Sequence, residues 1–128
     1  MIPSRISFRH RFLFLTLLAA PWALPLPGFA QAVDQEFTFA TSLVEWGFPD
    51  LANKVMDAVV RLHPDQAGRA KIVKAESFIA ARKFPEAEAL AKELPANDPK
   101  ADAIQLAIAR GYFRFGQLDK AREIYNAF

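Results

Sequence analysis

The 128-residue chain contains no cysteine. This absence excludes a disulfide framework, a thiolate metal site, a thiol nucleophile and a cysteine-linked lipid anchor. Histidine is almost as scarce, because His63 is the only one after residue 32. A single histidine without cysteine cannot form a common zinc site. We therefore expect neither a metal nor any other cofactor.

The chain also lacks a large charge of one sign once its N-terminal segment is set aside. Its formal net charge is +2, from 16 basic and 14 acidic residues. The segment 1–32 holds three arginines, Arg5, Arg9 and Arg11, and no acidic residue, which leaves 13 basic against 14 acidic residues in the rest. A nearly neutral body gives no electrostatic reason to expect nucleic acid or an anionic membrane as a partner.

No stretch alternates apolar and polar residues over a useful length, so β-strands are not expected. A glycine-rich phosphate-binding loop is missing as well. Instead, apolar residues recur every three and four positions in six runs, which is the pattern of one buried helix face. Pro49 and Pro85 stand where a helix begins, and Asp98 before Pro99 is typical of a helix N-cap. The sequence predicts an all-α protein.

The segment 1–32 has the three-part layout of a secretory signal peptide. Arginines precede an apolar run over residues 12–24, Pro25 and Pro27 follow as helix breakers, and Ala30 and Ala32 are the small residues of a cleavage site. We predict a signal peptide over residues 1–32, cleaved after Ala32 or, as second choice, after Ala30. An uncleaved anchor is the alternative, although the run is short for a span of about 20 residues. The rest would then be exported, to the periplasm of a Gram-negative bacterium or outside the cell.

Residues 33–128 repeat one unit nearly three times. Ala52, Ala87 and Ala121 recur at nearly equal intervals, and the segments around them align without gaps. A period of about 34 positions, with two helices per unit, is typical of a helical repeat array. We place the units at about 33–66, 67–100 and 101–128, the last one incomplete. The residues predicted to pack within the repeats are Ala40, Leu43, Ala52, Ala75, Phe78, Ala87, Ala109, Tyr112, Ala121 and Tyr125.

These residues resemble the tetratricopeptide repeat family over the whole of residues 33–128. The first helices pair a small residue with a larger one three positions later, and Pro64 and Pro99 end units. The second helices of the first and third units place a bulky residue four positions after the small one, whereas the middle unit has Ala91 there. The family's tryptophan is replaced by Glu36, Lys71 and Gln105, and its glycine is alanine in all three units. The resemblance implies an α-solenoid of stacked antiparallel helical hairpins.

In the resembling family, the first helices line a concave groove that usually holds a peptide. The groove residues that the resemblance implies are Phe37, Thr41, Val44, Glu45, Arg69, Ile72, Glu76, Ile79, Leu106, Arg110, Phe113 and Arg114. Apolar Val44, Ile79 and Phe113 occupy equivalent places, with Arg110 and Arg114 beside the last. Such a row could bind an extended or helical peptide that carries carboxylates. Alternatively, the apolar residues only pack adjacent helices and the arginines pair with Glu76.

No catalytic constellation is recognisable after residue 32. Ser42 and Ser77 are the only serines there, and nothing in the sequence brings His63 to either of them. His63 is better explained as a helix C-terminal residue, where an imidazole suits the negative end of the dipole. We therefore expect a protein that is not an enzyme.

The leading hypothesis is an exported, non-catalytic protein–protein interaction module that binds a partner protein or peptide. One alternative is an N-terminal docking arm of a larger enzyme or receptor whose active domain lies beyond residue 128. Another is a structural, self-associating envelope protein. Tyr125 and Phe128 leave apolar surface on the last helix, which either further repeats or another chain would cover.

Overall fold

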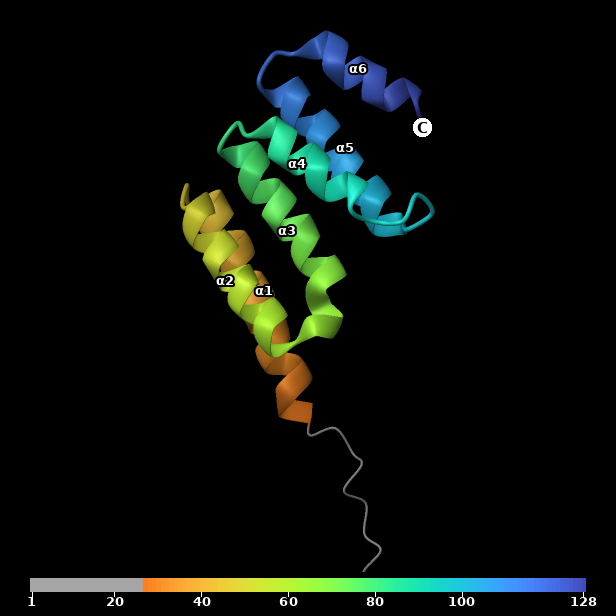
Figure 1. Ribbon diagram of the computed structural model, residues 1–128. Helices are drawn as coiled ribbons and strands as arrows, with labels where there is room; N and C mark the ends of the chain where they lie inside the picture. The colour runs from red at the N-terminus through yellow and green to blue at the C-terminus, as the bar shows by residue number, and fades with distance from the viewer. Residues whose placement is uncertain (1–26) are drawn as a thin grey trace, which may run out of the picture.

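The computed structural model describes residues 27–128, which form six α-helices and one turn of 3-10 helix (Figure 1). In chain order these are α1 (Pro27–Glu45), α2 (Pro49–Leu62), η1 (Pro64–Gln66), α3 (Ala67–Ala80), α4 (Phe84–Lys92), α5 (Pro99–Arg114) and α6 (Leu118–Asn126). Residues 27–128 contain no strand. The all-α prediction is confirmed.

Local sequence signals explain where the helices begin and end. Proline occupies the first position of α2 and α5 and the second position of α4, where its missing N–H removes no helical hydrogen bond. The Asp98 carboxylate caps α5 by accepting a hydrogen bond of 2.9 Å from the backbone N–H of Lys100. Gly47 and Gly116 follow α1 and α5 with φ angles of +86° and +77°, which glycine adopts without strain.

Arg82 occupies the same turn position after α3, with a φ angle of +61°. A side chain in this conformation costs about 1–2 kcal/mol. The Arg82 guanidinium lies 4.5 Å from the centre of the Phe115 ring, so a cation–π contact offsets part of this cost.

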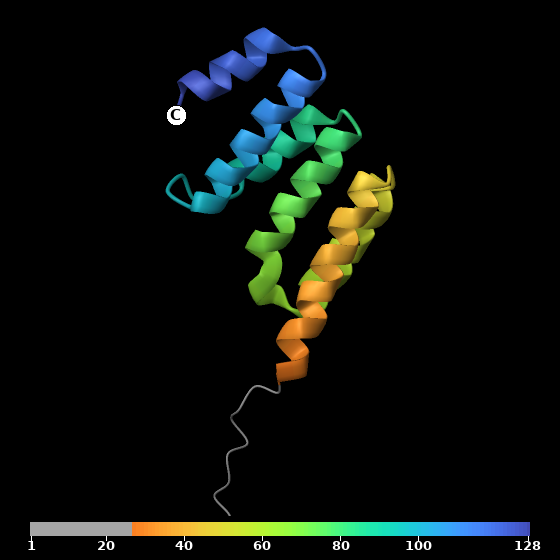
Figure 2. The ribbon, with the colours of Figure 1, turned by 180° about the vertical axis from the view of Figure 1, so that it is seen from behind.

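The helices pair into three hairpins that stack along the chain. Each helix packs against the next one in sequence, and the first helices also pack on one another, α1 against α3 and α3 against α5. Figure 2 shows α1, α3 and α5 in succession along one side of the stack. This arrangement is the predicted α-solenoid of antiparallel hairpins.

The core is divided into two apolar clusters that share α3. The first joins α1 and α2 to the start of α3 and contains Phe37, Leu43, Met56 and Val73. The second joins the end of α3 to α4, α5 and α6. Ala40, Ala52, Ala75, Ala87 and Ala109 are fully enclosed, and Ala121 nearly so, which lets the helices approach closely.

Phe78 and Tyr125 occupy bulky packing positions of the repeat, but unlike Tyr112 they are not fully buried. Phe78 is only partly buried and packs against the second cluster. Tyr125 is 43% exposed, which agrees with the expectation that it leaves apolar surface on the last helix. Its partner Ala121 is buried, but no helix within residues 27–128 covers the outer side of α6.

Helix α1 begins earlier than predicted. Pro27 was expected to break a helix and instead occupies the first position of α1, where proline is well tolerated. The two predicted cleavage residues, Ala30 and Ala32, are exposed in the first turns of this helix. The arginines, the apolar run and Pro25 lie outside the described residues. Among the described side chains, Val33 is the first that is buried.

Candidate functional site: a concave pocket on the first helices

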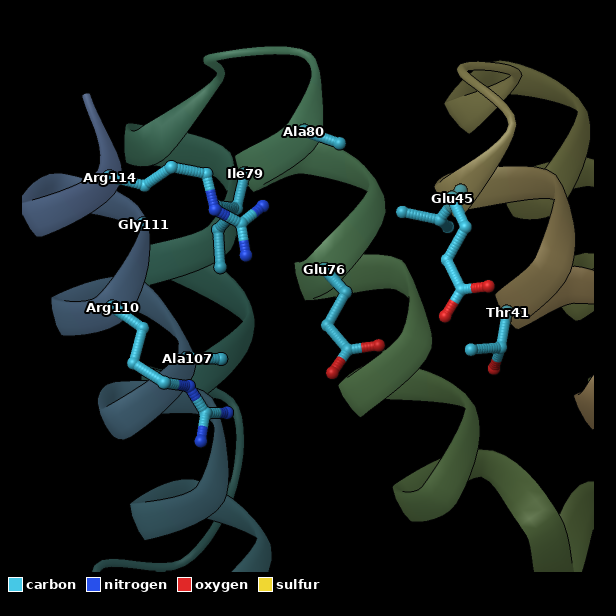
Figure 3. Close-up of a pocket in the computed structure, with 10 residues that line it drawn as sticks. Thr41, Glu45, Glu76, Ile79, Ala80, Ala107, Arg110, Gly111 and Arg114 are labelled. Carbon is cyan, nitrogen blue, oxygen red and sulfur yellow. The ribbon is translucent and has the colours of Figure 1, made fainter.

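A pocket of about 330 Å³ opens on the side of the array formed by the first helices (Figure 3). Its lining residues come only from α1, α3 and α5: Thr41, Val44, Glu45, Glu76, Ile79, Ala80, Ala107, Arg110, Gly111 and Arg114. The helical repeat explains why they meet. Thr41, Glu76 and Arg110 occupy the same position in successive units, so they lie on the same face of successive first helices.

The charged side chains of the pocket are separated by sign. Glu45 and Glu76 extend from α1 and α3, whereas Arg110 and Arg114 extend from α5 (Figure 3). Burial raises the pKa of Glu76, the positive charge of Arg110 lowers it, and the negative charge of Glu45 raises it further. The pocket therefore presents an acidic wall opposite a basic wall.

Neither arginine forms an ion pair with Glu76 within 4.0 Å in the part of the chain that the structure describes. The alternative that the arginines serve to pair with Glu76 thus has no support at contact distance. A ligand that carries both signs of charge could neutralise both walls at once.

The pocket floor is apolar and is shaped by small residues. Gly111 lies against Ile79 and Phe84 so closely that a Cβ atom added to it would overlap the Ile79 Cγ2 methyl and lie 3.0 Å from Phe84 Cε1. Ala80 and Ala107 also leave space where larger side chains would fill the pocket. The sequence-based prediction missed these three residues, although small residues beside charged ones on the first helices were a signal that could have marked them.

Seven of the predicted groove residues line this pocket: Thr41, Val44, Glu45, Glu76, Ile79, Arg110 and Arg114. Phe37 does not, because it is 4% exposed and belongs to the first core cluster. The Arg69 guanidinium lies 3.9 Å above the Phe37 ring and forms a 2.6 Å ion pair with Asp34. Ile72 and Leu106 are partly buried and also lie outside the pocket.

The prediction that Phe113 shares a row with Val44 and Ile79 in the groove is wrong. Phe113 is 64% exposed and lines a different hollow, with residues of α6. Ile79 at the equivalent position packs against the next first helix at Gly111. Since no further first helix follows α5 within the described residues, no such helix covers Phe113.

A second hollow, of about 540 Å³, lies between α2, α3 and α4. Its two lysines already have partners, because Lys71 is 2.8 Å from Glu93 and Lys74 is 2.8 Å from Asp57. Among residues 27–128, the charged side chains of the concave pocket have no ion-pair partner within 4.0 Å, so this pocket is the stronger candidate for a ligand.

Residues 27–128 hold neither a candidate metal-binding cluster nor a candidate membrane span. In that range no three acidic or histidine side chains cluster in a way that could hold a metal ion. The helices of the same range are too short or too polar to cross a membrane.

The raised pKa of Glu76 predicts a pH dependence of stability. A carboxyl whose pKa is raised on folding favours the folded state below its ordinary pKa of 4.5, and this contribution is lost as the pH rises through the folded value. We therefore expect Glu76→Gln to be at least as stable as the parent at pH 7, because an amide is less costly to bury than a carboxylate. Urea denaturation at several pH values measures this effect. The difference in unfolding free energy between Glu76→Gln and the parent should vanish at pH 4.5 and below.

Glu36→Gln, which changes an exposed carboxylate on α1, is the control for this measurement and should leave the stability unchanged at pH 7. A Glu76→Gln protein that is clearly less stable than the parent at pH 7 would show that the carboxylate has a stabilising partner.

Comparison with known proteins places the repeats in a family. A family model described as tetratricopeptide repeat matches twice, at residues 37–102 and 72–128. Comparison with curated proteins and with solved structures gives no match. Repeats of this family suggest a protein–protein interaction module and are typically non-catalytic scaffolds. The two matches span residues 37–128, well over half of the chain, and the chain belongs to the tetratricopeptide repeat family.

Proposed function

We propose that this protein is an exported, non-catalytic interaction module that holds a segment of a partner protein in the concave pocket. The observation that carries the proposal is the pairing of an acidic wall, Glu45 and Glu76, with a basic wall, Arg110 and Arg114, across an apolar floor. Binding of this kind needs shape and charge rather than bond-making groups. It agrees with the interaction role that the repeat family suggests.

The charges define the polarity of the partner segment. A carboxylate can accept two parallel hydrogen bonds from the fork of an arginine, so acidic groups would lie toward α5. A lysine or arginine of the partner would lie toward Glu45 and Glu76. Apolar side chains between them would cover Val44 and Ile79. An extended or helical segment with separated charges of both signs fits these requirements.

Export rests on the layout of the segment 1–32 and on one feature of the fold. Cleavage after Ala32 would leave Val33, the first buried side chain among the described residues, as the new N-terminus. Both core clusters would keep all their members. Recovery of the protein from the cytoplasm alone would contradict export. N-terminal sequencing of protein recovered outside the cytoplasm tests the cleavage, and a chain that starts at Met1 would contradict it.

Arg110→Glu is expected to weaken binding of a peptide in the pocket by at least about tenfold, because a charge-assisted hydrogen bond contributes about 1.5–3 kcal/mol. The probe is a displayed library of random dodecapeptides selected on the wild-type protein. Affinities of the enriched peptides are then measured for wild type and variant by fluorescence anisotropy.

Lys54→Glu is the matched control, since it makes the same charge reversal at an exposed position of α2 outside the pocket. It should leave the affinity unchanged. If no peptide is enriched, or if the peptides bind Arg110→Glu as tightly as wild type, the pocket is not the binding site.

A further inference from the structure

The two ends of the repeat array expose apolar residues that the concave pocket does not use. On the outer side of the last hairpin, a hollow of about 300 Å³ is lined by Phe113, Leu118, Ala121, Arg122 and Tyr125. On the outer side of the first hairpin, α1 exposes Phe39 and the residue after its end, Trp46, is exposed too. Each surface has a counterpart that is buried inside the array.

The residues that line the hollow of the last hairpin occupy repeat positions that are covered in the middle unit. In that unit, the positions equivalent to its lining residues are held by Ile79, Phe84, Ala87, Glu88 and Ala91. All of these except Glu88 belong to the second core cluster, where they pack with Ile104 and Ile108 of α5. The middle unit therefore uses this surface to bind the first helix of the following unit.

The outward side of α1 is likewise a copy of a surface that is buried in α5. Phe39, Ser42 and Trp46 correspond to Ile108, Gly111 and Phe115 of the third unit. Ile108 is completely buried, and Phe115 packs edge-on against Phe84 of the preceding hairpin with ring centres 6.0 Å apart.

In the middle unit, the same side of the first helix also faces the preceding hairpin. Lys74, at the position of Phe39, extends back to the preceding hairpin and lies 2.8 Å from Asp57 of α2. In both later units, then, this side of the first helix faces the hairpin before it.

We propose that two copies of this protein bind head to tail, with α1 of one copy on the outer side of α5 and α6 of the other. Phe39 of the first copy fills the hollow lined by Phe113, Leu118 and Tyr125 of the second. The contact repeats between copies the packing that α5 makes within the chain on α3 and α4. Because the two surfaces differ, the contact is heterologous and leaves a free surface at each end. The proposal is independent of the concave pocket.

The absence of cysteine makes a direct cross-linking test possible. Ser42→Cys and Phe113→Cys are introduced into two separately tagged copies of the full chain, which are produced together and mildly oxidised. Their internal counterparts, Gly111 and Ile79, are in direct contact. The paired cysteines would thus have Cβ atoms within roughly 4 Å, the range that a disulfide spans. We expect a disulfide-linked dimer that contains one copy of each tag.

Adding Phe39→Asp to the Ser42→Cys copy should lower the yield of this mixed dimer at least tenfold. Phe39 is exposed, so the variant should keep the circular dichroism spectrum of the parent. Asp65→Cys in place of Ser42→Cys measures random collision, because residue 65 is exposed and belongs to neither surface. A mixed dimer that is no more abundant than in this control would overturn the proposal. It would do so equally if another protein or further repeats covered the outer side of α5 and α6. A dimer linked only between two copies of the Phe113→Cys chain would overturn it too, in favour of tail-to-tail pairing.

Discussion

Replacing Tyr112 by alanine is expected to lower the free energy of unfolding by about 3–5 kcal/mol, the cost of removing a large buried aromatic side chain. Tyr112 is 5% exposed and stacks on Phe84 with ring centres 4.0 Å apart and planes inclined by 10°. Its hydroxyl donates a 2.8 Å hydrogen bond to Glu88 Oε1. The side chain therefore ties α5 to α4, and its loss leaves a cavity between two hairpins. Urea denaturation followed by circular dichroism measures the effect.

In the same experiment, Tyr112→Phe distinguishes the stability contribution of the ring from that of the hydroxyl. It keeps the stacking and loses only the hydrogen bond, so we expect a cost of about 1 kcal/mol. Burial, together with the hydrogen bond and charge of Glu88, raises the pKa of Tyr112 to about 12. The stability that depends on the protonated phenol is thus complete below about pH 10, the ordinary pKa of tyrosine. In the parent it is lost as the pH rises toward 12, whereas Tyr112→Phe should show no such loss. A Tyr112→Ala protein that loses less than about 1 kcal/mol would contradict the described packing.

Gly111→Ala is expected to destabilise the fold by about 2 kcal/mol, the net of two opposing effects. Alanine improves helix propensity by about 1 kcal/mol, but overpacking costs about 1–3 kcal/mol. The upper part of that range applies, because the new Cβ overlaps a methyl group of Ile79, a β-branched residue with little rotameric freedom. Thermal and urea denaturation of the variant test this expectation.

Gly68→Ala on α3 is the matched control. A Cβ there would meet Lys100 Cδ at 3.0 Å, on a flexible side chain that can move, so the variant should be as stable as the parent or more stable. Combining Gly111→Ala with Ile79→Ala should cost less than the sum of the two single changes, because the smaller side chain makes room for the new methyl. Strict additivity would show that residues 79 and 111 do not touch.

Local sequence was sufficient for the helices and for their order. Apolar residues every three and four positions, prolines at helix starts and the regular recurrence of Ala52, Ala87 and Ala121 predicted three helical hairpins. The same recurrence placed Glu76 and Arg110 on the same face of successive first helices, where the structure has them. These properties follow from the helical period, which depends on neighbours within the chain.

Tertiary packing alone decided which of those faces are covered. Phe37 and Phe113 both lie on first helices, yet the first core cluster encloses one and nothing within the described residues covers the other. Tyr125 is exposed for the same reason. The side of a helix on which a residue lies is a local property. Its burial depends on whether another hairpin packs on that side, and a repeat presents the same side both to an interior neighbour and, at its ends, to solvent.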